Sequence, residues 1–207
     1  MCISFASTQN AVWAKKHLGV DLPTGYPREA FPGYLAPLVI KSHRSGRVAI
    51  GLAEFGLIPY WSKDRKIQKY TYNARFETVA EKPSYRTPWK SRRLGVVLVD
   101  HFYEPSYASG KAIPTAIQSQ RDEPLGIASI WDTWSNPDSG EVVTSFSLMT
   151  INADDHPLMN TFHKPNEEKR TPLLLRGNQL LHWLDASPDD ANAWMTHHNF
   201  PELVQAR

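Results

Sequence analysis

Apolar residues dominate several short stretches in the middle of the chain and favour β-strands there. The most continuous stretch, residues 94–102, is rich in valine and leucine, which is typical of a strand buried on both faces. Turn residues separate the stretches, with Ser45-Gly46 between the first two and Asp138-Ser139-Gly140 before the last. The other predicted strands cover residues 38–43, 48–57, 111–118, 125–134 and 142–151.

A helix is expected close to the N-terminus. The apolar positions between residues 11 and 18 fall on one side of a helix that Ser7 or Thr8 would cap and Gly19 would end. The following residues, 20–37, are rich in proline and glycine, and this composition predicts a loop.

A second helix is expected near the other end of the chain. Ser187 offers a capping hydroxyl, Pro188 suits the first helical position, and two acidic residues follow in the first turn. This helix would run to about His197. Residues 62–92 show a mixed pattern of loop and short helix.

Strands in the middle and helices at the ends predict an α+β fold, in which a largely antiparallel, barrel-like sheet carries flanking short helices. With 207 residues, the chain is expected to form a single domain spanning residues 1–207. No apolar run approaches the roughly 18–20 residues that a membrane helix needs, and the first residues lack a secretory signal, so a cytoplasmic location is expected. Cys2 is the only cysteine, which excludes an internal disulfide, a cysteine-cluster zinc site and an iron–sulfur site. We expect no cofactor and no metal.

Positive charge is concentrated between residues 61 and 93, although the formal net charge of the chain is only +2. Basic groups neutralise phosphates and aromatic faces stack exposed bases, so this segment is a candidate surface for a single-stranded nucleic acid. The alternative is a solvated basic face over aromatic residues of the core. The basic residues are Lys63, Arg65, Lys66, Lys69, Arg75, Lys82, Arg86, Lys90, Arg92 and Arg93. The aromatic residues are Trp61, Tyr70, Tyr72, Phe76, Tyr85 and Trp89.

Cys2 offers chemistry that no internal cysteine has. Removal of Met1 would leave an α-amine and a thiol on adjacent carbons, with ordinary pKa values of about 8 and about 8.5. Such a 1,2-aminothiol condenses with an aldehyde, because the amine forms an imine and the sulfur then closes a five-membered thiazolidine. The alternative is a chance cysteine in a frayed terminus.

Four other residues are candidates for polar chemistry. Asn73 can orient an amine or a carbonyl, and Arg75 can hold a phosphate through two parallel hydrogen bonds. Glu104 is expected just after the strand over residues 94–102, where a carboxyl can act as acid or base. His163 suits proton transfer near neutral pH, with His156 as a nearby competitor. For each of them, an ordinary structural role in a loop or a cap is the alternative.

Taken together, eight motifs in this order resemble the SRAP family (SOS response-associated peptidases, also called abasic site processing proteins). They extend over roughly residues 1–185, and their order and spacing are more specific than any one of them. The motifs are Met1-Cys2; Pro32-Gly33-Tyr34-Leu35-Ala36-Pro37; Phe55-Gly56-Leu57-Ile58-Pro59-Tyr60-Trp61; Tyr72-Asn73-Ala74-Arg75-Phe76-Glu77-Thr78; Phe102-Tyr103-Glu104; Gly126-Ile127-Ala128-Ser129-Ile130-Trp131; Leu148-Met149-Thr150-Ile151-Asn152-Ala153; and His163 followed by Arg170-Thr171-Pro172.

The resemblance implies a compact α+β domain with a positive groove for single-stranded DNA and a terminal cysteine that crosslinks to the aldehyde of an abasic site. Cys2 would then be the nucleophile, Asn73 would position its amino group, and Arg75 would hold the phosphate beside the lesion. Glu104 would act as acid and base, and His163 would assist proton transfer to the opened sugar. Further strand contacts are expected from Trp61, Lys69, Arg86 and Arg170.

The same resemblance implies the setting in which the chain works. Its partner would be single-stranded DNA that contains abasic sites, including DNA at replication forks, and the crosslink would protect the damaged strand. We expect a monomer that associates with the nucleoid when it is bound to DNA. The activity would combine lyase-like Schiff-base chemistry with a self-processing peptidase activity that removes Met1.

The chain departs from the usual family pattern at three places, and two other functions stay open. Ile3-Ser4 replaces a Gly-Arg pair, which removes one phosphate contact, Pro105 replaces a tryptophan, and residues 164–169 lengthen the histidine motif. One alternative is an N-terminal cysteine hydrolase that acts on peptide or amide bonds. The other is a non-catalytic module that binds single-stranded DNA.

Overall fold

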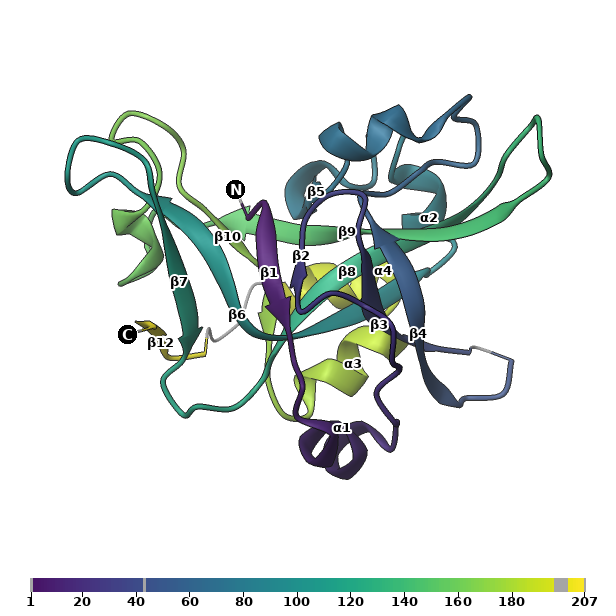
Figure 1. Ribbon diagram of the computed structural model, residues 1–207, viewed down its shortest axis with the longest axis horizontal. Helices are drawn as coiled ribbons and strands as arrows, with labels where there is room; N and C mark the ends of the chain where they lie inside the picture. Colours follow the sequence, from purple (N-terminus) through teal and green to yellow (C-terminus); the bar gives the residue numbers. More distant parts are fainter. Residues whose placement is uncertain (1, 43, 196–200, 207) are drawn as a thin grey trace.

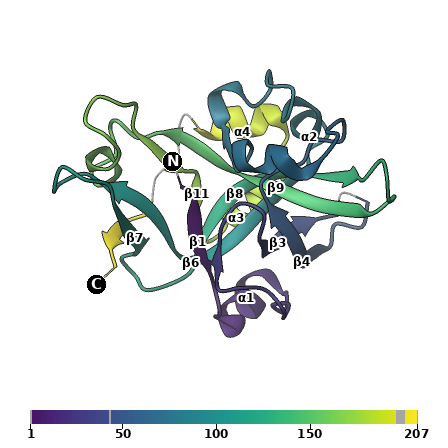
Figure 2. The same cartoon turned by 45° about the horizontal axis from the view of Figure 1, so that its top comes forward.

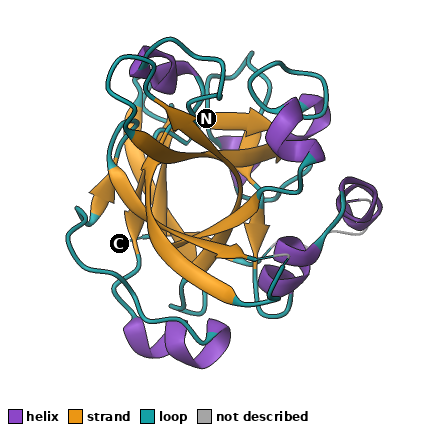
Figure 3. Cartoon of the chain, turned by 90° about the vertical axis from the view of Figure 1, so that its right-hand side faces the viewer, coloured by secondary structure: helices purple, strands orange, loops and turns teal. Residues whose placement is uncertain are grey.

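Five strands of the computed structural model, which describes residues 2–42, 44–195 and 201–206, close into a barrel (Figure 3). Around the ring, β3 pairs with β4, β4 with β9, β9 with β8, β8 with β6, and β6 with β3. Only the β4–β9 contact of this ring is parallel. The barrel strands are β3 (Leu35–Lys41), β4 (Val48–Phe55), β6 (Leu94–Ser106), β8 (Leu125–Ser135) and β9 (Val142–Asn152).

Shorter strands extend the sheet from the barrel (Figure 1). On β6, β1 pairs with one edge and also with β2, while β7 pairs with β6 and with β12. On β9, β5 adds in parallel and β10 in antiparallel orientation, and β11 pairs with β8. These strands are β1 (Ser4–Ser7), β2 (Glu29–Ala30), β5 (Asn73–Arg75), β7 (Ile113–Ser119), β10 (Arg170–Pro172), β11 (Leu174–Leu175) and β12 (Leu203–Gln205).

Short helices flank the barrel, with α2 and α4 on the same side of it in Figure 2. A row of tryptophans joins three of these helices. The ring centroid of Trp183 on α3 lies 6.3 Å from that of Trp89 on α2 and 6.4 Å from that of Trp194 on α4. The α-helices are α1 (Ala11–Leu18), α2 (Arg86–Lys90), α3 (Gln179–Asp185) and α4 (Pro188–Met195). The 3-10 helices are η1 (Arg65–Tyr70), η2 (Phe76–Thr78) and η3 (Met159–Thr161).

Successive residues of the barrel strands contribute to two separate hydrophobic clusters. On β6, Val97 and Val99 pack in the barrel interior with phenylalanines from β1, β4 and β9. Val96 and Leu98 pack outward beneath α2, α3 and α4. Because both faces of β6 are covered, its sequence is a continuous apolar run and does not alternate between apolar and polar residues.

The structure confirms the predicted fold class and most of the predicted strands. The hairpin between β8 and β9 turns at the predicted position, where Gly140 has a φ of 73° and donates its N–H to the carbonyl of Asn136. The predicted loop over residues 20–37 is wrong in part, since it contains β2 and the start of β3. The predicted ends at His43 and His197 lie outside the described residues.

The predicted helix cap at Ser7 or Thr8 is wrong. Ser7 belongs to β1, and α1 is capped by Asn10, whose Oδ1 accepts a hydrogen bond from the N–H of Trp13. Thr8 instead accepts a hydrogen bond from the N–H of Asn10 and so supports the cap. The N-terminal segment therefore enters the sheet directly, which places Cys2 beside β6.

Candidate active site at the N-terminal strand

Cys2 lies two residues before the start of β1 and is fully buried. Strand β1 is held against β6 with Ser4 opposite Tyr103, which brings the N-terminal segment to the end of β6 (Figure 1). The thiol donates a hydrogen bond to the carbonyl of Ser4, at 3.3 Å. Burial raises the pKa of the Cys2 thiol far above its ordinary value, so the sulfur is held as a neutral thiol that needs a base before it can attack.

Asn73 contacts the segment directly from the other side. Its Nδ2 donates a hydrogen bond to the carbonyl of Cys2, at 2.8 Å. The residue is itself fixed, because β5 pairs with β9 with Asn73 opposite Leu148, and the hydroxyl of Tyr85 donates to the carbonyl of Asn73. The structure thus joins the two predicted residues, through the Cys2 carbonyl.

Glu104 lies inside β6, which runs on to Ser106, and not just after the strand as predicted. The strand continues because residues 101–106 pair with β7, with Glu104 opposite Thr115. The side chain is 1 % exposed, and burial raises the pKa of Glu104 to about 7. Its charge in turn raises the pKa of the Cys2 thiol, which places the two groups in one electrostatic environment. A carboxyl of this kind exchanges a proton readily at neutral pH.

His163 is placed against Glu104 by the backbone. The residue has a φ of 62°, and its N–H donates to the carbonyl of Pro105, at 3.0 Å. Its Nε2 lies 3.5 Å from Oε2 of Glu104 and 3.0 Å from the carbonyl oxygen of Arg170. Because that carbonyl can only accept, Nε2 carries a proton. Burial lowers the pKa of His163, so the ring is neutral at pH 7.

His156, the competing histidine, has a structural role. Its Nδ1 accepts hydrogen bonds from the N–H groups of Leu158 and Met159, both at 3.1 Å. This arrangement caps the turn that leads into η3. His163 is therefore the histidine that the fold brings to Glu104.

Arg75 and Arg170 meet at a pair of glutamates next to this cluster. Nη1 of Arg75 lies 2.8 Å from Oε2 of Glu168, and Nη1 of Arg170 lies 2.8 Å from Oε1 of the same carboxylate. Arg170 also donates to both oxygens of Glu77, at 2.9 and 2.8 Å, and to the carbonyl of Thr150. The Arg170 side chain is 3 % exposed, whereas Arg75 is 48 % exposed. Arg170 is a predicted strand contact, but its side chain is almost fully buried. At this surface only the acidic partners in its ion pairs are exposed.

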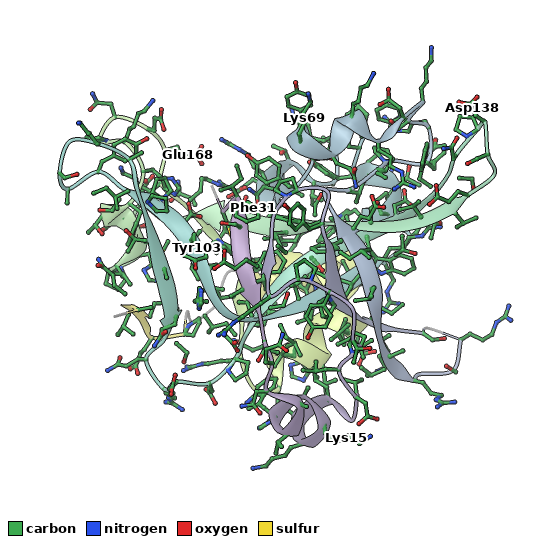
Figure 4. The ribbon with its side chains drawn as sticks, viewed as in Figure 1. Lys15, Phe31, Lys69, Tyr103, Asp138 and Glu168 are labelled. Atoms are coloured by element: carbon green, nitrogen blue, oxygen red, sulfur yellow. The ribbon has the colours of Figure 1, made fainter. Side chains whose placement is uncertain are left out.

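A cleft of about 430 Å³ opens beside Glu104. Most of its walls are apolar, and Figure 4 shows two of the wall residues, Phe31 and Tyr103, near β1. The size is in the range of sites for small molecules or single nucleotide units. Because Glu104 belongs to the lining, the cleft gives an approach to this buried carboxyl. The lining residues are Ile3, Ser4, Glu29, Phe31, Tyr72, Tyr103, Glu104, Pro105 and Pro114.

Some residues of the basic and aromatic segment serve the fold instead of a ligand. Arg65 pairs with Glu54 and Glu141, and Arg93 pairs with Asp132. Two of the aromatic residues, Tyr85 and Trp89, belong to the hydrophobic core. For these residues, the alternative of a structural role therefore holds.

The remaining predicted strand contacts are exposed. Trp61 is 47 % exposed and donates its indole N–H to the carbonyl of Pro83. Lys69 lies over the ring of Tyr70 on η1, and Arg86 begins α2. These side chains lie on segments outside the cluster around Cys2, as Figure 4 shows for Lys69.

The sequence did not indicate two acidic residues of this region, Glu77 and Glu168. The pairs of Glu77 with Arg170 and of Glu168 with Arg75 join positions about 90 residues apart in the chain, so no local pattern marks these two pairs. Within the described residues, no group of three or more His, Cys, Asp or Glu side chains is arranged to hold a metal ion. In the same part of the chain, no helix is long and apolar enough to cross a membrane.

Comparison with known proteins establishes the family. The sequence model of the SOS response associated peptidase (SRAP) family matches residues 1–205. The chain belongs to the SRAP family. This confirms the resemblance drawn from the motifs. A solved structure, of a protein from Bordetella bronchiseptica, has a TM-score of 0.87 at 26% identity over 100% of both chains. A protein from Bacteroides thetaiotaomicron shares the fold, with a TM-score of 0.79 at 22% identity over 100% of this chain and 92% of that one.

Two curated relatives of this SRAP chain carry the name abasic site processing protein. YoqW from Bacillus subtilis (strain 168) is 32% identical over 142 residues, which are 68% of this chain and 59% of YoqW. HMCES from Gallus gallus is 29% identical over 153 residues, which are 63% of this chain and 44% of HMCES. The matched region therefore spans less than two thirds of the length of these relatives.

Proposed function

We propose that this SRAP protein processes abasic sites in single-stranded DNA, by forming a thiazolidine crosslink between Cys2 and the ring-opened sugar after removal of Met1. The observation that carries the proposal is the gathering of Cys2, Asn73, Glu104 and His163 from four separate segments. The names of the curated relatives support an abasic site as the substrate. Removal of Met1, in our proposal a self-processing step, frees the α-amine on which the chemistry depends.

The first half of the reaction is imine formation. The amine of Cys2 adds to the aldehyde carbon, and a C–N bond forms while the carbonyl oxygen becomes a hydroxyl. Protonated Glu104 then gives its proton to this hydroxyl, which leaves as water, so that a protonated C=N bond (an iminium) forms and Glu104 is left ionised. Burial suits Glu104 to this step, because a carboxyl with a pKa of about 7 is substantially protonated at neutral pH.

The second half closes the ring. Glu104, now ionised, takes the proton from the Cys2 thiol, and the sulfur adds to the imine carbon. The electron pair of the C=N bond returns to the nitrogen, which keeps its own proton, so the neutral five-membered ring forms with no net change in oxidation state. Neutral His163 acts as a relay to the hydroxyls of the opened sugar, since its proton on Nε2 lies on the side of Glu104.

The strand is held outside the reacting groups. Arg75 is exposed and lies two residues after Asn73 on β5, and a guanidinium holds a phosphate through two parallel hydrogen bonds. The cleft beside Glu104 receives the opened sugar, which carries no charge. Trp61, Lys69 and Arg86 provide more distant contacts to the strand.

The test uses protein with an unmodified N-terminus and a single-stranded oligonucleotide that carries one abasic site. A band that resists denaturation is expected with the wild-type chain and not with Cys2→Ala, an N-terminal tag or undamaged DNA. Glu104→Gln should slow the appearance of the band while DNA binding is retained. Arg75→Ala should weaken capture of the strand.

The same experiment separates the two alternative functions. DNA binding that is indifferent to Cys2→Ala and gives no covalent band would indicate a non-catalytic binding module. Turnover of peptide or amide substrates that needs Cys2 and is unaffected by DNA would indicate an N-terminal cysteine hydrolase.

A further inference from the structure

Glu168 lies on a segment that is anchored at both ends. His163, before it, is bound through its N–H to Pro105, and Lys169, after it, is bound through its N–H to Asp154 and through its carbonyl to Ala153. The Glu168 side chain is 38 % exposed and projects from this segment near the top of the molecule (Figure 4). Its carboxylate can therefore rotate into solvent while the backbone of the segment stays in place.

The carboxylate of Glu168 makes the contacts that a phosphodiester would make. Its two oxygens are shared between two arginines, with Oε2 at 2.8 Å from Arg75 and Oε1 at 2.8 Å from Arg170. A phosphodiester likewise presents two non-bridging oxygens, which share one negative charge, to neighbouring guanidinium groups. The Arg170 guanidinium is locked by its bonds to Glu77, so one wall of this anion site is rigid before any ligand arrives.

We propose that the Glu168 carboxylate occupies the position of a DNA phosphate between Arg75 and Arg170, and that the strand must displace it in order to bind. The inference rests on the proposed function, because single-stranded DNA is the ligand. A hydrogen bond from Arg170 lowers the pKa of Glu168, so the competing group is an anion at every physiological pH. Glu168 thus sets the affinity of the site.

Two measurable consequences follow from this competition. Replacing Glu168 by glutamine frees Arg75 for the phosphate, and breaking two partly exposed ion pairs corresponds to about 2- to 10-fold tighter binding. The salt dependence changes as well. In the wild type, Glu168 already neutralises the arginine, so the site neutralises one phosphate charge fewer and fewer cations leave the DNA. In Glu168→Gln, one more phosphate charge is neutralised and about 0.7 more cations leave the DNA, so log K against log salt steepens by about 0.7.

The experiment is a titration of undamaged, fluorescently labelled single-stranded DNA, followed by anisotropy at several salt concentrations. Wild type, Glu168→Gln and the matched control Glu167→Gln are compared. Glu167 lies on the same segment and pairs with Lys164, so its variant loses the same charge without touching Arg75 or Arg170. We expect tighter binding and the steeper salt slope in Glu168→Gln, with both changes much smaller in Glu167→Gln.

A double-mutant cycle shows whether the effect passes through Arg75. In the Arg75→Ala background, Glu168→Gln should gain clearly less affinity than in the wild type. Equal gains in the two backgrounds, or equal effects of Glu168→Gln and Glu167→Gln, would overturn the inference and leave the proposed function intact. Failure of every variant to bind single-stranded DNA at low salt would overturn both.

Discussion

The buried carboxyl of Glu104 has a consequence for stability that can be measured without DNA. The native protein holds the proton of Glu104 up to a pKa of about 7, whereas the unfolded chain releases it near 4.5. Between these values the native state binds more protons, so the free energy of unfolding falls as the pH rises. The stabilisation is complete below about pH 4.5 and is lost once the pH has passed about 7.

Glu104→Gln removes this dependence, because an amide does not titrate. A pKa raised from 4.5 to about 7 corresponds to about 3 kcal/mol at ~1.4 kcal/mol for each pH unit. Since the group is almost fully buried, solvent screening does not reduce this figure. Between about pH 5 and pH 8, the variant should therefore gain about 2.5 kcal/mol of stability relative to the wild type.

The assay is urea denaturation followed by tryptophan fluorescence, with both proteins carrying the same N-terminus. Glu29→Gln is the matched control, because it removes an exposed carboxyl at the rim of the same cleft and leaves Glu104 in place. A difference between Glu104→Gln and wild type that stays constant within about 0.5 kcal/mol over this range would refute the reasoning. Glu104 would then not be a proton donor at neutral pH.

Three further changes test the fold and the strand-binding surface. Gly56→Ala should destabilise the protein by about 2 kcal/mol in urea denaturation, because the φ of Gly56 is +101° and a Cβ there would lie 2.6 Å from the carbonyl oxygen of Gln68. Gly51→Ala is the control, because a Cβ at Gly51 would meet open space. Arg170→Ala should lower the free energy of unfolding by about 2–4 kcal/mol, because it leaves the buried carbonyl of Thr150 without this donor; an unchanged value would contradict the buried network. Arg75→Ala should leave stability within about 0.5 kcal/mol but weaken binding of single-stranded DNA roughly three- to ten-fold in anisotropy titrations, and unaltered affinity would remove its role.

The barrel strands could be predicted because the apolar side chains within each short stretch favour a strand by themselves. The run over residues 94–102 is apolar on both faces, and the structure covers both faces of β6. The end of this strand could not be predicted, because residues 103–106 continue as a strand through their pairing with β7, which follows later in the chain. The same non-local pairing moves Glu104 from an expected loop into the interior.

The residues of the candidate site could be predicted from the sequence, but the contacts between them could not. The motifs that resemble the SRAP family named Cys2, Asn73, Glu104 and His163, whose roles remain predictions. Composition alone could not separate the exposed cations from those that the fold neutralises. Arg65 and Arg93 are balanced by acids that lie far away in the chain. The contact between Arg75 and Glu168 is equally non-local.

The most direct test of the proposed chemistry is the mass of the N-terminal peptide after reaction with an abasic oligonucleotide. DNA is digested to the damaged nucleotide, the protein is cleaved with a protease, and the peptide is fragmented in a mass spectrometer. The proposal predicts a peptide that begins at Cys2 without Met1, joined to the opened sugar with the loss of one water. A peptide that retains Met1, or a crosslink that maps to a lysine, would contradict it.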